Sequence, residues 1–229
     1  MPVTVDYVTE DANSVGKAMD NHIELIKTRG SGQKKRDDLA AAIANLTQLN
    51  TGQINSQNFL DIKTKEQNSL MGKAQDLIMG IRKAAKSASK ESGGNVNLKV
   101  FRIGTDVPHS VKAMTSMLDY YSDVVVEHHD MLIANGMTEE EIAGVPALYA
   151  SLVAADAAQE NAKKLRNNAT ERRDKAARDL QQIVSGIRSY AANVFKNDRA
   201  ALEEFKPIPK GRGRAKSKPA EPAGAPSQQ

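Results

Sequence analysis

Apolar residues recur every three or four positions along most of this chain, the spacing that gives an α-helix one buried face. In the first such stretch, from about residue 11 to 29, the recurring positions are Val15, Met19, His22 and Ile26. The glycines that follow in Gly30-Ser31-Gly32 favour a tight turn. We therefore predict an irregular lead over residues 1–9 and a first helix that ends at this turn.

The helical pattern resumes near Gln33 and continues to the turn-forming residues around Gly93. Asn50-Thr51-Gly52 is a weak point where this long helix could bend, break or continue, because Asn and Gly favour turns over helix interiors. Residues 97–103 then alternate between apolar and polar side chains. That alternation fits either a short strand or an extended segment lying on a helical core.

The second half of the chain repeats this plan. A helical pattern over about 108–135 is followed by Gly136. Thr138 and Glu141 have the spacing of a capping box, which predicts a single helical turn that is interrupted near Gly144-Val145-Pro146. A long helix then follows over about 147–197.

Aligning the chain with itself at an offset of 106 residues indicates an internal duplication. Without a gap, 14 positions between 22 and 90 are identical to the positions 106 residues later. The longest run places Gly80-Ile81-Arg82 on Gly186-Ile187-Arg188. Other pairs are His22 with His128, Gln53 with Gln159, Asn55 with Asn161, and Thr64 with Thr170. Such self-similarity is typical of architectures built from repeated units.

The predicted fold is therefore all-α: an internally duplicated helical hairpin that forms an elongated four-helix bundle with pseudo-twofold symmetry. The first hairpin repeat covers residues 1–106, the second covers 107–205, and together they make one bundle domain. An alternative is an extended hairpin that completes its core only by dimerising. Residues 206–229, rich in Pro and basic side chains, predict a disordered tail.

The repeated Gly-Ile-Arg segment lies near the far end of each long helix. A helix of 50 residues is about 75 Å long, so these ends outrun the shorter helix of their own hairpin. We expect Gly80, Ile81, Gly186 and Ile187 at tight interhelical contacts, between the two halves or between chains. The alternative is that the exposed backbone of the glycines contacts a ligand.

Composition supports a helical protein and narrows its chemistry. Hydrophobic residues make up 40% and aromatic residues 4%, so the apolar content is mainly that of good helix formers. The chain has no Cys, which excludes disulfides, thiolate metal sites and a Cys nucleophile. We see neither a signal peptide nor an apolar run of membrane-spanning length, and we expect a cytoplasmic protein with no membrane span.

The net charge of +4 is concentrated at the C-terminal end. Residues 206–229 contain six basic side chains and one acidic one, which leaves the rest of the chain at about −1. Cations spaced along this tail could bind a polyanion, either nucleic acid or an anionic surface; the alternative is a solubilising tail. The residues concerned are Lys210, Arg212, Arg214, Lys216 and Lys218.

Several polar residues are candidates for a site inside the bundle. His22 and His128 are equivalent in the repeat and predict either a paired metal or proton site or two hydrogen-bonded core histidines. The run from Glu127 to Asp130 looks like a metal cluster, but neighbouring residues on a helix diverge by about 100°, which favours a solvated acidic face. The repeated amides Gln53, Asn55, Gln159 and Asn161 could form a buried polar layer that sets helix register, or lie at the solvent edge.

No phosphate-binding loop and no nucleophile with a spaced base is present, so we expect no enzyme activity and no cofactor. Our first hypothesis is a structural or protein-interaction protein that uses its long helical faces to bind another protein or itself. The second is a nucleic-acid- or anionic-surface-associated protein that acts through the tail. The third is a metal-binding bundle centred on His22 and His128.

Overall fold

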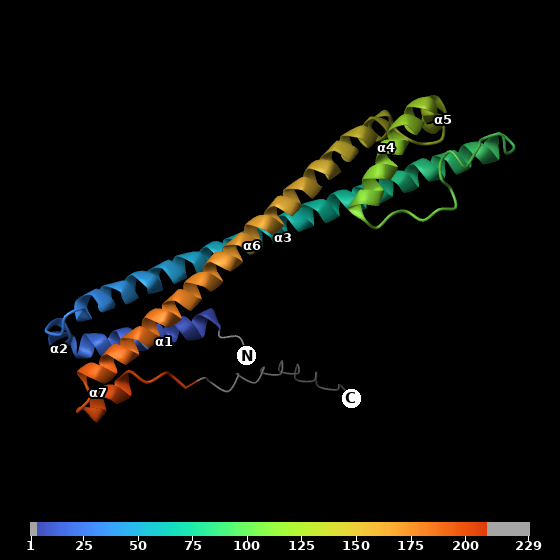
Figure 1. Cartoon of the computed structure of the whole chain (residues 1–229). Coiled ribbons are helices and arrows are strands. Elements are labelled where there is room, and N and C mark those ends of the chain that lie inside the picture. The colour runs from blue at the N-terminus through green and yellow to red at the C-terminus, as the bar shows by residue number, and fades with distance from the viewer. Residues whose placement is uncertain (1–3, 210–229) are drawn as a thin grey trace, which may run out of the picture. The chain divides into compact units, whose positions relative to one another are not determined.

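The protein is all-helical. The computed structural model describes residues 4–209, of which 81% lie in helices and none in a strand (Figure 1). The helices are α1 (Val5–Asn21), α2 (Ile23–Lys27), α3 (Gly32–Glu91), α4 (Val111–Glu127), α5 (His129–Ala134), α6 (Glu139–Val194) and α7 (Arg199–Glu204).

Polar side chains cap the starts of these helices. Thr4, Ser110 and Asp198 each accept a hydrogen bond from the third backbone N–H that follows, at the starts of α1, α4 and α7. At the start of α6 the predicted capping box is confirmed. The N–H of Glu141 donates to the Thr138 hydroxyl at 3.1 Å, and the Thr138 N–H donates to the Glu141 carboxylate at 2.9 Å.

The two shorter predicted helices are each divided at a histidine. Where one helix was expected over 11–29, α1 begins earlier, at Val5, and ends at His22, after which α2 begins. In the same way α4 ends at His128 and α5 follows. His22 has φ −114° and ψ 22°, and His128 has φ −113° and ψ 24°. This bridge conformation interrupts the helix in both places.

The two long helices are continuous, without the possible break at residues 50–52 or the interruption expected at residues 144–146. α3 passes through Asn50-Thr51-Gly52, and α6 contains Pro146 in its second turn. A proline this close to the helix start removes one backbone hydrogen bond, to the carbonyl four residues earlier, and the helix continues around it. α6 ends at Val194, and the short helix α7 was not predicted.

The segment between α3 and α4 contains no strand. Residues 98–104 form turns, and Phe101 is fully buried among them. Arg102 has φ 47°, a left-handed conformation that reverses the chain directly after Phe101. The apolar residues of this segment therefore cover the helical core through turns rather than through an extended strand.

The chain divides into two compact units, each made of segments from both predicted repeats. Among the described residues, unit 1 comprises residues 4–48 and 173–209, and unit 2 comprises residues 49–172. In unit 1, α1 and α2 pack with the first part of α3 and the last part of α6. The buried side chains there include Val8, Val15, Met19, Ile26, Leu39, Leu46, Leu180, Val184, Ile187 and Phe195.

Unit 2 is built in the same manner from the last part of α3, the turns over 98–104, α4, α5 and the first part of α6. Its core includes Ile78, Ile81, Phe101, Met114, Leu118, Tyr121, Leu132, Val145 and Leu152. Two pairs of helices in the two predicted repeats begin 106 residues apart. α1 and α4, both 17 residues long, begin at Val5 and Val111, and α2 and α5 begin at Ile23 and His129.

Candidate interaction surface

Within unit 2, α3 and α6 lie side by side in opposite directions and are joined by polar contacts. Arg166 Nε donates to Gln57 Oε1 at 3.0 Å, and Gln159 Nε2 donates to Thr64 Oγ1 at 3.3 Å. Gln67 Nε2 donates to Asp156 Oδ1 at 2.8 Å. In each contact the residue numbers sum to 223, so position n of α3 is level with position 223−n of α6. The pair is therefore antiparallel and stays in register.

The part of the helix pair that contains these contacts buries very few side chains. From Leu49 to Glu66 no side chain of α3 is buried, and on α6 Ala162 is the single buried residue between Val153 and Arg172. Elsewhere in unit 2, α3 buries a residue on nearly every turn from Gln67 onward. We call residues 49–66 of α3 and 157–172 of α6 the bare stretch.

Large apolar side chains are exposed along the bare stretch. On α3 these are Ile54 at 49%, Phe59 at 41% and Ile62 at 52% exposed, and on α6 Leu165 at 48%. Scattered exposed hydrophobic residues are normal on protein surfaces, whereas a group beside an unfilled core marks an interaction site. The bare stretch thus has the composition of a helix pair that another helix can cover.

The predicted tight contacts at the repeated glycines are wrong within this chain. A Cβ atom placed on Gly80 or Gly186 would have no heavy atom within 4 Å. The neighbouring Ile81 and Ile187 are buried, so the helices contact their surroundings through the isoleucines while the glycines face away. The glycines therefore do not mark where the long helices cross, and a contact with another chain remains a prediction.

In each Gly-Ile-Arg segment it is the arginine, and not the glycine, that contacts other parts of the same unit. In unit 1, Arg188 donates to both carboxylate oxygens of Asp11 in α1, at 3.0 and 2.8 Å, and its Nε donates to the Phe205 carbonyl at 2.7 Å. The Ile208 N–H also donates to Asp11, at 3.1 Å. Arg188 thereby joins α6, α1 and the segment after α7.

In unit 2, Arg82 makes an equivalent set of contacts with different partners. Its guanidinium donates to the Thr105 carbonyl at 2.8 Å, to the Thr105 hydroxyl at 3.1 Å and to the Tyr121 hydroxyl at 3.2 Å. Arg82 is buried, and the Tyr121 hydroxyl in turn donates to the carbonyl of Phe101. Burial raises the pKa of Tyr121, which therefore remains a neutral donor.

His22 and His128 are half-buried helix ends rather than a buried pair, so their prediction as paired core residues is wrong. They belong to different compact units. His22 packs on Phe195 with ring centroids 4.9 Å apart and contacts Glu204 at 3.2 Å. His128 packs on Phe101 at 5.1 Å. Within residues 4–209 no group of three or more His, Asp or Glu side chains is placed to hold a metal ion.

The neighbouring His129 has two acidic partners. Its Nδ1 lies 3.0 Å from Asp130 and its Nε2 lies 2.7 Å from Glu139, which is in the first turn of α6. These hydrogen bonds, first to Asp130 and then to Glu139, raise the pKa of His129. The acidic residues that we considered as metal ligands, Glu127 and Asp130, are exposed, as expected of a solvated face.

The repeated amides do not form a buried layer. Asn55 and Asn161 are exposed, so their prediction as core residues is wrong. Gln53 and Gln159 are half-buried, and the bond from Gln159 to Thr64 joins α6 to α3. Of the amides, Gln159 thus has a place in the register of the helix pair.

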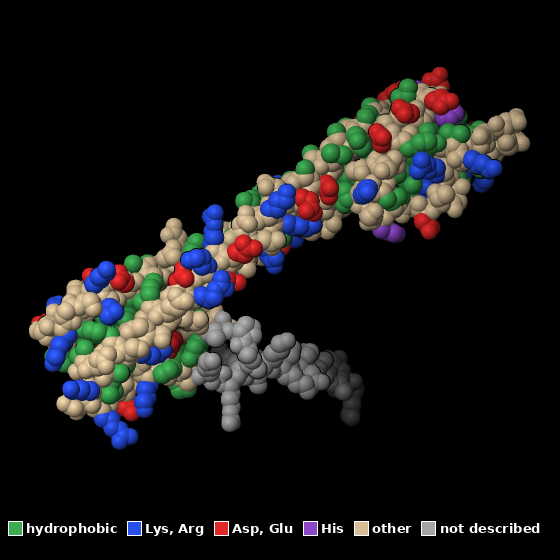
Figure 2. All heavy atoms as spheres, in the orientation of Figure 1, with side chains coloured by type: hydrophobic (Ala, Val, Ile, Leu, Met, Phe, Trp, Pro, Cys, Tyr) green, Lys and Arg blue, Asp and Glu red, His purple; other side chains and the backbone are tan. Residues whose placement is uncertain are grey.

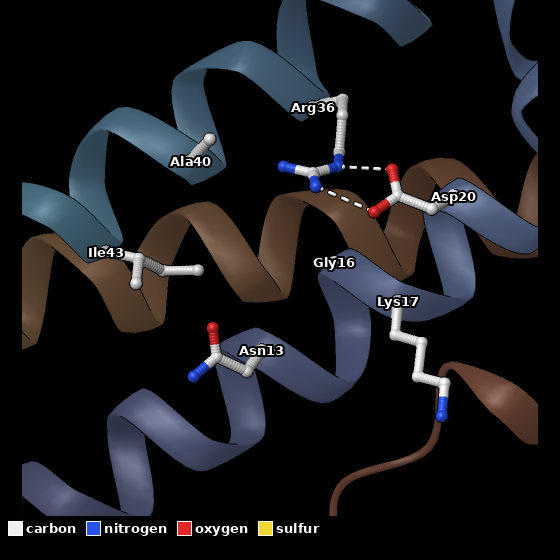
Figure 3. Close-up of a pocket in the computed structure, with 7 residues that line it drawn as sticks. All are labelled: Asn13, Gly16, Lys17, Asp20, Arg36, Ala40 and Ile43. Carbon is white, nitrogen blue, oxygen red and sulfur yellow. Dashed lines mark hydrogen bonds and ion pairs between the residues drawn. The ribbon is translucent and has the colours of Figure 1, made fainter.

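A groove in unit 1 lies between α1 and the first turns of α3 (Figure 3). It has a volume of about 340 Å³ and is lined by Asn13, Gly16, Lys17, Asp20, Arg36, Ala40 and Ile43. Arg36 donates to both oxygens of Asp20, each at 2.7 Å, and this bond lowers the pKa of Asp20 and raises that of Arg36. Asp20 and Arg36 therefore pair with each other, and the third charged residue of the lining is Lys17.

The tail residues Lys210, Arg212, Arg214, Lys216 and Lys218 lie outside the described residues. Binding of a polyanion through them stays a prediction. The described chain leads up to this tail along unit 1, where the Tyr7 hydroxyl donates to the Ile208 carbonyl at 3.1 Å.

By length and composition, one described helix, α6, could cross a membrane, and 17% of the apolar window concerned is buried. A single helix of this kind is weak evidence. Between Ile142 and Ala158 its one charged residue is Asp156, which accepts the hydrogen bond from Gln67. The absence of a membrane span stays a prediction.

No family model, no curated protein and no solved structure matches this chain.

Proposed function

We propose that this chain is a non-enzymatic helical interaction protein, and that the bare stretch of α3 and α6 is where it binds a helical partner. The observation that carries the proposal is the run from Leu49 to Glu66, which buries no side chain yet exposes Ile54, Phe59 and Ile62. A third or fourth helix laid on this pair would give these side chains the core that they lack.

The free energy gained by burying exposed apolar side chains favours a bound partner. Isolated helices gain little stability in water, and most helical stability in proteins comes from packing an apolar face. In the bare stretch that packing is replaced by hydrogen bonds such as Arg166–Gln57 and Gln159–Thr64, each of which contributes about 0.5–1.5 kcal/mol. Full burial of a Phe, Ile or Leu side chain contributes about 1.5–3 kcal/mol. Ile54, Phe59, Ile62 and Leu165 are 41–52% exposed, so covering them adds roughly half of that amount for each side chain.

The proposal also concerns the architecture of the chain, which we infer to be a duplicated helical hairpin. The repeated offset of 106 residues in the sequence and in the helix starts supports a duplicated hairpin, in which α1, α2 and α3 correspond to α4, α5 and α6. An unfilled two-helix stretch supports the variant of that architecture in which the four-helix bundle is completed by another polypeptide. The groove around Asp20 and Arg36 favours interaction over catalysis, because the carboxylate that lines it is already paired with Arg36.

Site-specific photo-crosslinking in cells tests this function. p-Benzoylphenylalanine replaces Phe59 in one variant and Met79 in a control. Met79 is 43% exposed and also lies on α3, but outside the bare stretch. We expect a discrete adduct from position 59 and none from position 79. No adduct at position 59, or equal adducts at both positions, would sink the proposal.

A further inference from the structure

Unit 2 contains a long acidic segment. Residues 113–162, which comprise most of α4, all of α5 and the first part of α6, contain nine acidic side chains and no Lys or Arg. The whole chain has a net charge of +4, so the remaining residues together carry +13. In Figure 2, acidic side chains gather where Figure 1 places α5 and the start of α6, and hydrophobic side chains follow along α6. This end of unit 2 therefore combines negative charge with exposed apolar surface.

The first part of α6 exposes an apolar helix face. Over residues 143–157 none of the exposed side chains is charged, and Ser151 is their one polar member. Asp156, the only charged residue there, is half-buried and accepts a hydrogen bond from Gln67 of α3. The exposed apolar residues are Ala143, Pro146, Ala147, Ala150, Val153, Ala154 and Ala157. Val153 is 45% exposed and Val126, at the end of α4, is 74% exposed, so this surface includes large side chains as well as alanines.

Val126 of α4 and Pro146 of α6 lie on the same side of unit 2. The groove of Figure 3 is lined by α1 and α3, and each of its seven lining residues has a counterpart 106 residues later on α4 or α6. The counterparts are Asp119, Ser122, Asp123, Val126, Ile142, Pro146 and Tyr149. In five of the seven pairs the two residues are both exposed or both half-buried, so α4 and α6 turn corresponding positions outward. Ala150 and Val153 continue the side of Pro146, four and seven residues further along α6. We call the side of unit 2 with Asp119, Asp123, Val126, Pro146, Ala150 and Val153 the acidic apolar face.

The carboxylates of the acidic apolar face are not neutralised by the chain itself. In unit 1, Asp20 forms an ion pair with Arg36, whereas Val126 stands at the position that corresponds to Asp20 in unit 2. Within residues 4–209, neither Asp119 nor Asp123 has a hydrogen-bond or ion-pair partner for its carboxylate. The acidic apolar face therefore presents two unpaired negative charges beside an exposed apolar surface.

We infer that the acidic apolar face binds a basic amphipathic helix of a partner protein. This is a second interaction surface, which shares no residue with the bare stretch and does not depend on it. A helix with apolar residues three and four positions apart packs them on Val126, Pro146 and Val153. Its Lys and Arg side chains then reach Asp119 and Asp123, an arrangement that charge complementarity favours.

The charge of this face decides between classes of partner. Nucleic acid and anionic lipid headgroups are repelled by a segment with nine carboxylates and no Lys or Arg. An uncharged helix would cover Asp119 and Asp123 without neutralising them, and burial of an unpaired carboxylate is costly. A cationic helix satisfies both the carboxylates and the apolar surface. Residues 143–157 extend about 22 Å, so a partner helix of about 15 residues covers them.

Fluorescence anisotropy with the purified full chain tests the inference. The probe is a labelled peptide of about 18 Leu and Lys residues, with every Leu on one helix face. We expect binding that weakens at least about fivefold between about 50 and 300 mM salt. A peptide with Glu in place of Lys, and a scrambled peptide without an apolar face, should each bind at least about tenfold more weakly. No binding of the Leu–Lys peptide, or equal binding of either control peptide, would overturn the inference.

Substitution of the two carboxylates tests where the peptide binds. Asp119→Asn combined with Asp123→Asn should raise the dissociation constant at least about fivefold at low salt and reduce its salt dependence. The matched control is Asp61→Asn combined with Asp76→Asn, which removes two exposed carboxylates from α3 of the same unit. It should change the dissociation constant less than about twofold. Equal effects of the two pairs would show that the peptide responds to net charge alone and would overturn the inferred site.

Substitution of the two valines tests the apolar part of the surface. Val126→Asn combined with Val153→Asn should raise the dissociation constant at least about fivefold, because the peptide loses the apolar area that it buries. The matched control is Ile62→Asn combined with Met79→Asn, at positions 52% and 43% exposed on α3, and should change it less than about twofold. Circular dichroism checks that each variant is folded. A control as damaging as the valine pair, or a chain that binds phosphatidylglycerol vesicles in preference to the peptide, would overturn the inference.

Discussion

Asp11 and Arg188, 177 positions apart, form two part-buried hydrogen bonds at 2.8 and 3.0 Å in unit 1. Asp11 is only 8% exposed, and its carboxylate also accepts from the Ile208 N–H. Arg188→Met keeps the length of the side chain but leaves this carboxylate without its cation. We expect the free energy of unfolding to fall by about 3–5 kcal/mol, because an unpaired buried charge is costly. Urea unfolding followed by circular dichroism measures the loss.

The control for that experiment is Arg36→Met. Arg36 makes the same bidentate contact with Asp20, at 2.7 Å, but the Asp20 side chain is 53% exposed. Exposed ion pairs contribute about 0–1 kcal/mol, so the loss should be small. A loss at Arg36 as large as that at Arg188 would show that burial does not determine the strength of these contacts.

Gly32→Ala and Gly80→Ala should change the stability of the protein in opposite directions. A Cβ on Gly32 would lie 2.2 Å from the Ile26 carbonyl oxygen and 2.6 Å from the Tyr190 hydroxyl, so Gly32→Ala forces the turn between α2 and α3 apart. We expect a destabilisation of about 1–3 kcal/mol. Gly80→Ala meets open space within a helix and should stabilise the protein by up to about 1 kcal/mol. Thermal unfolding of both variants checks the two signs, and a destabilising Gly80→Ala would restore the tight contact that we predicted there.

Tyr121→Phe should reveal how far Arg82 depends on its partner. The substitution removes the hydroxyl that accepts from Arg82 Nε and donates to the Phe101 carbonyl, and both of these groups are then left in the core. We expect a loss of about 1–3 kcal/mol in the free energy of unfolding. Tyr120→Phe, which removes one half-buried bond to the Val100 carbonyl, is the matched control and should cost less. Equal losses would contradict a special role for the buried bond.

The long-range periodicity of apolar residues was sufficient to predict the two long helices and the all-α class. Local chemistry predicted the Thr138–Glu141 capping box, because its two partners are three residues apart. The breaks at His22 and His128 were missed, since nothing in the local sequence forbids a helix there. Their conformation accompanies packing on Phe195 and Phe101, which are remote in the sequence.

The candidate site was less predictable for a related reason. A repeated glycine can mean a close approach or open space, and periodicity does not distinguish the two; at Gly80 it is open space. The roles of Arg82 and Arg188 depend on Thr105 and Asp11, whose proximity arises only in the folded chain. The bare stretch could have been suspected from the sequence, because Ile54, Phe59 and Ile62 do not share one helix face.

His129 should make stability depend on pH. Its pKa is raised by hydrogen bonds to Asp130 and Glu139, so the folded protein holds this proton more tightly than the unfolded chain does. The stabilisation is fully present below the ordinary histidine pKa of about 6.5 and is lost as the pH rises through the raised value. We therefore expect His129→Gln to unfold at a lower temperature than wild type at about pH 5.5 and at nearly the same temperature at about pH 8.5. Titration by NMR should place the midpoint of His129 above about 6.5, and Glu139→Gln should move it back toward that value. A wild-type advantage that is the same at both pH values would show that the proton on His129 does not link α5 to α6.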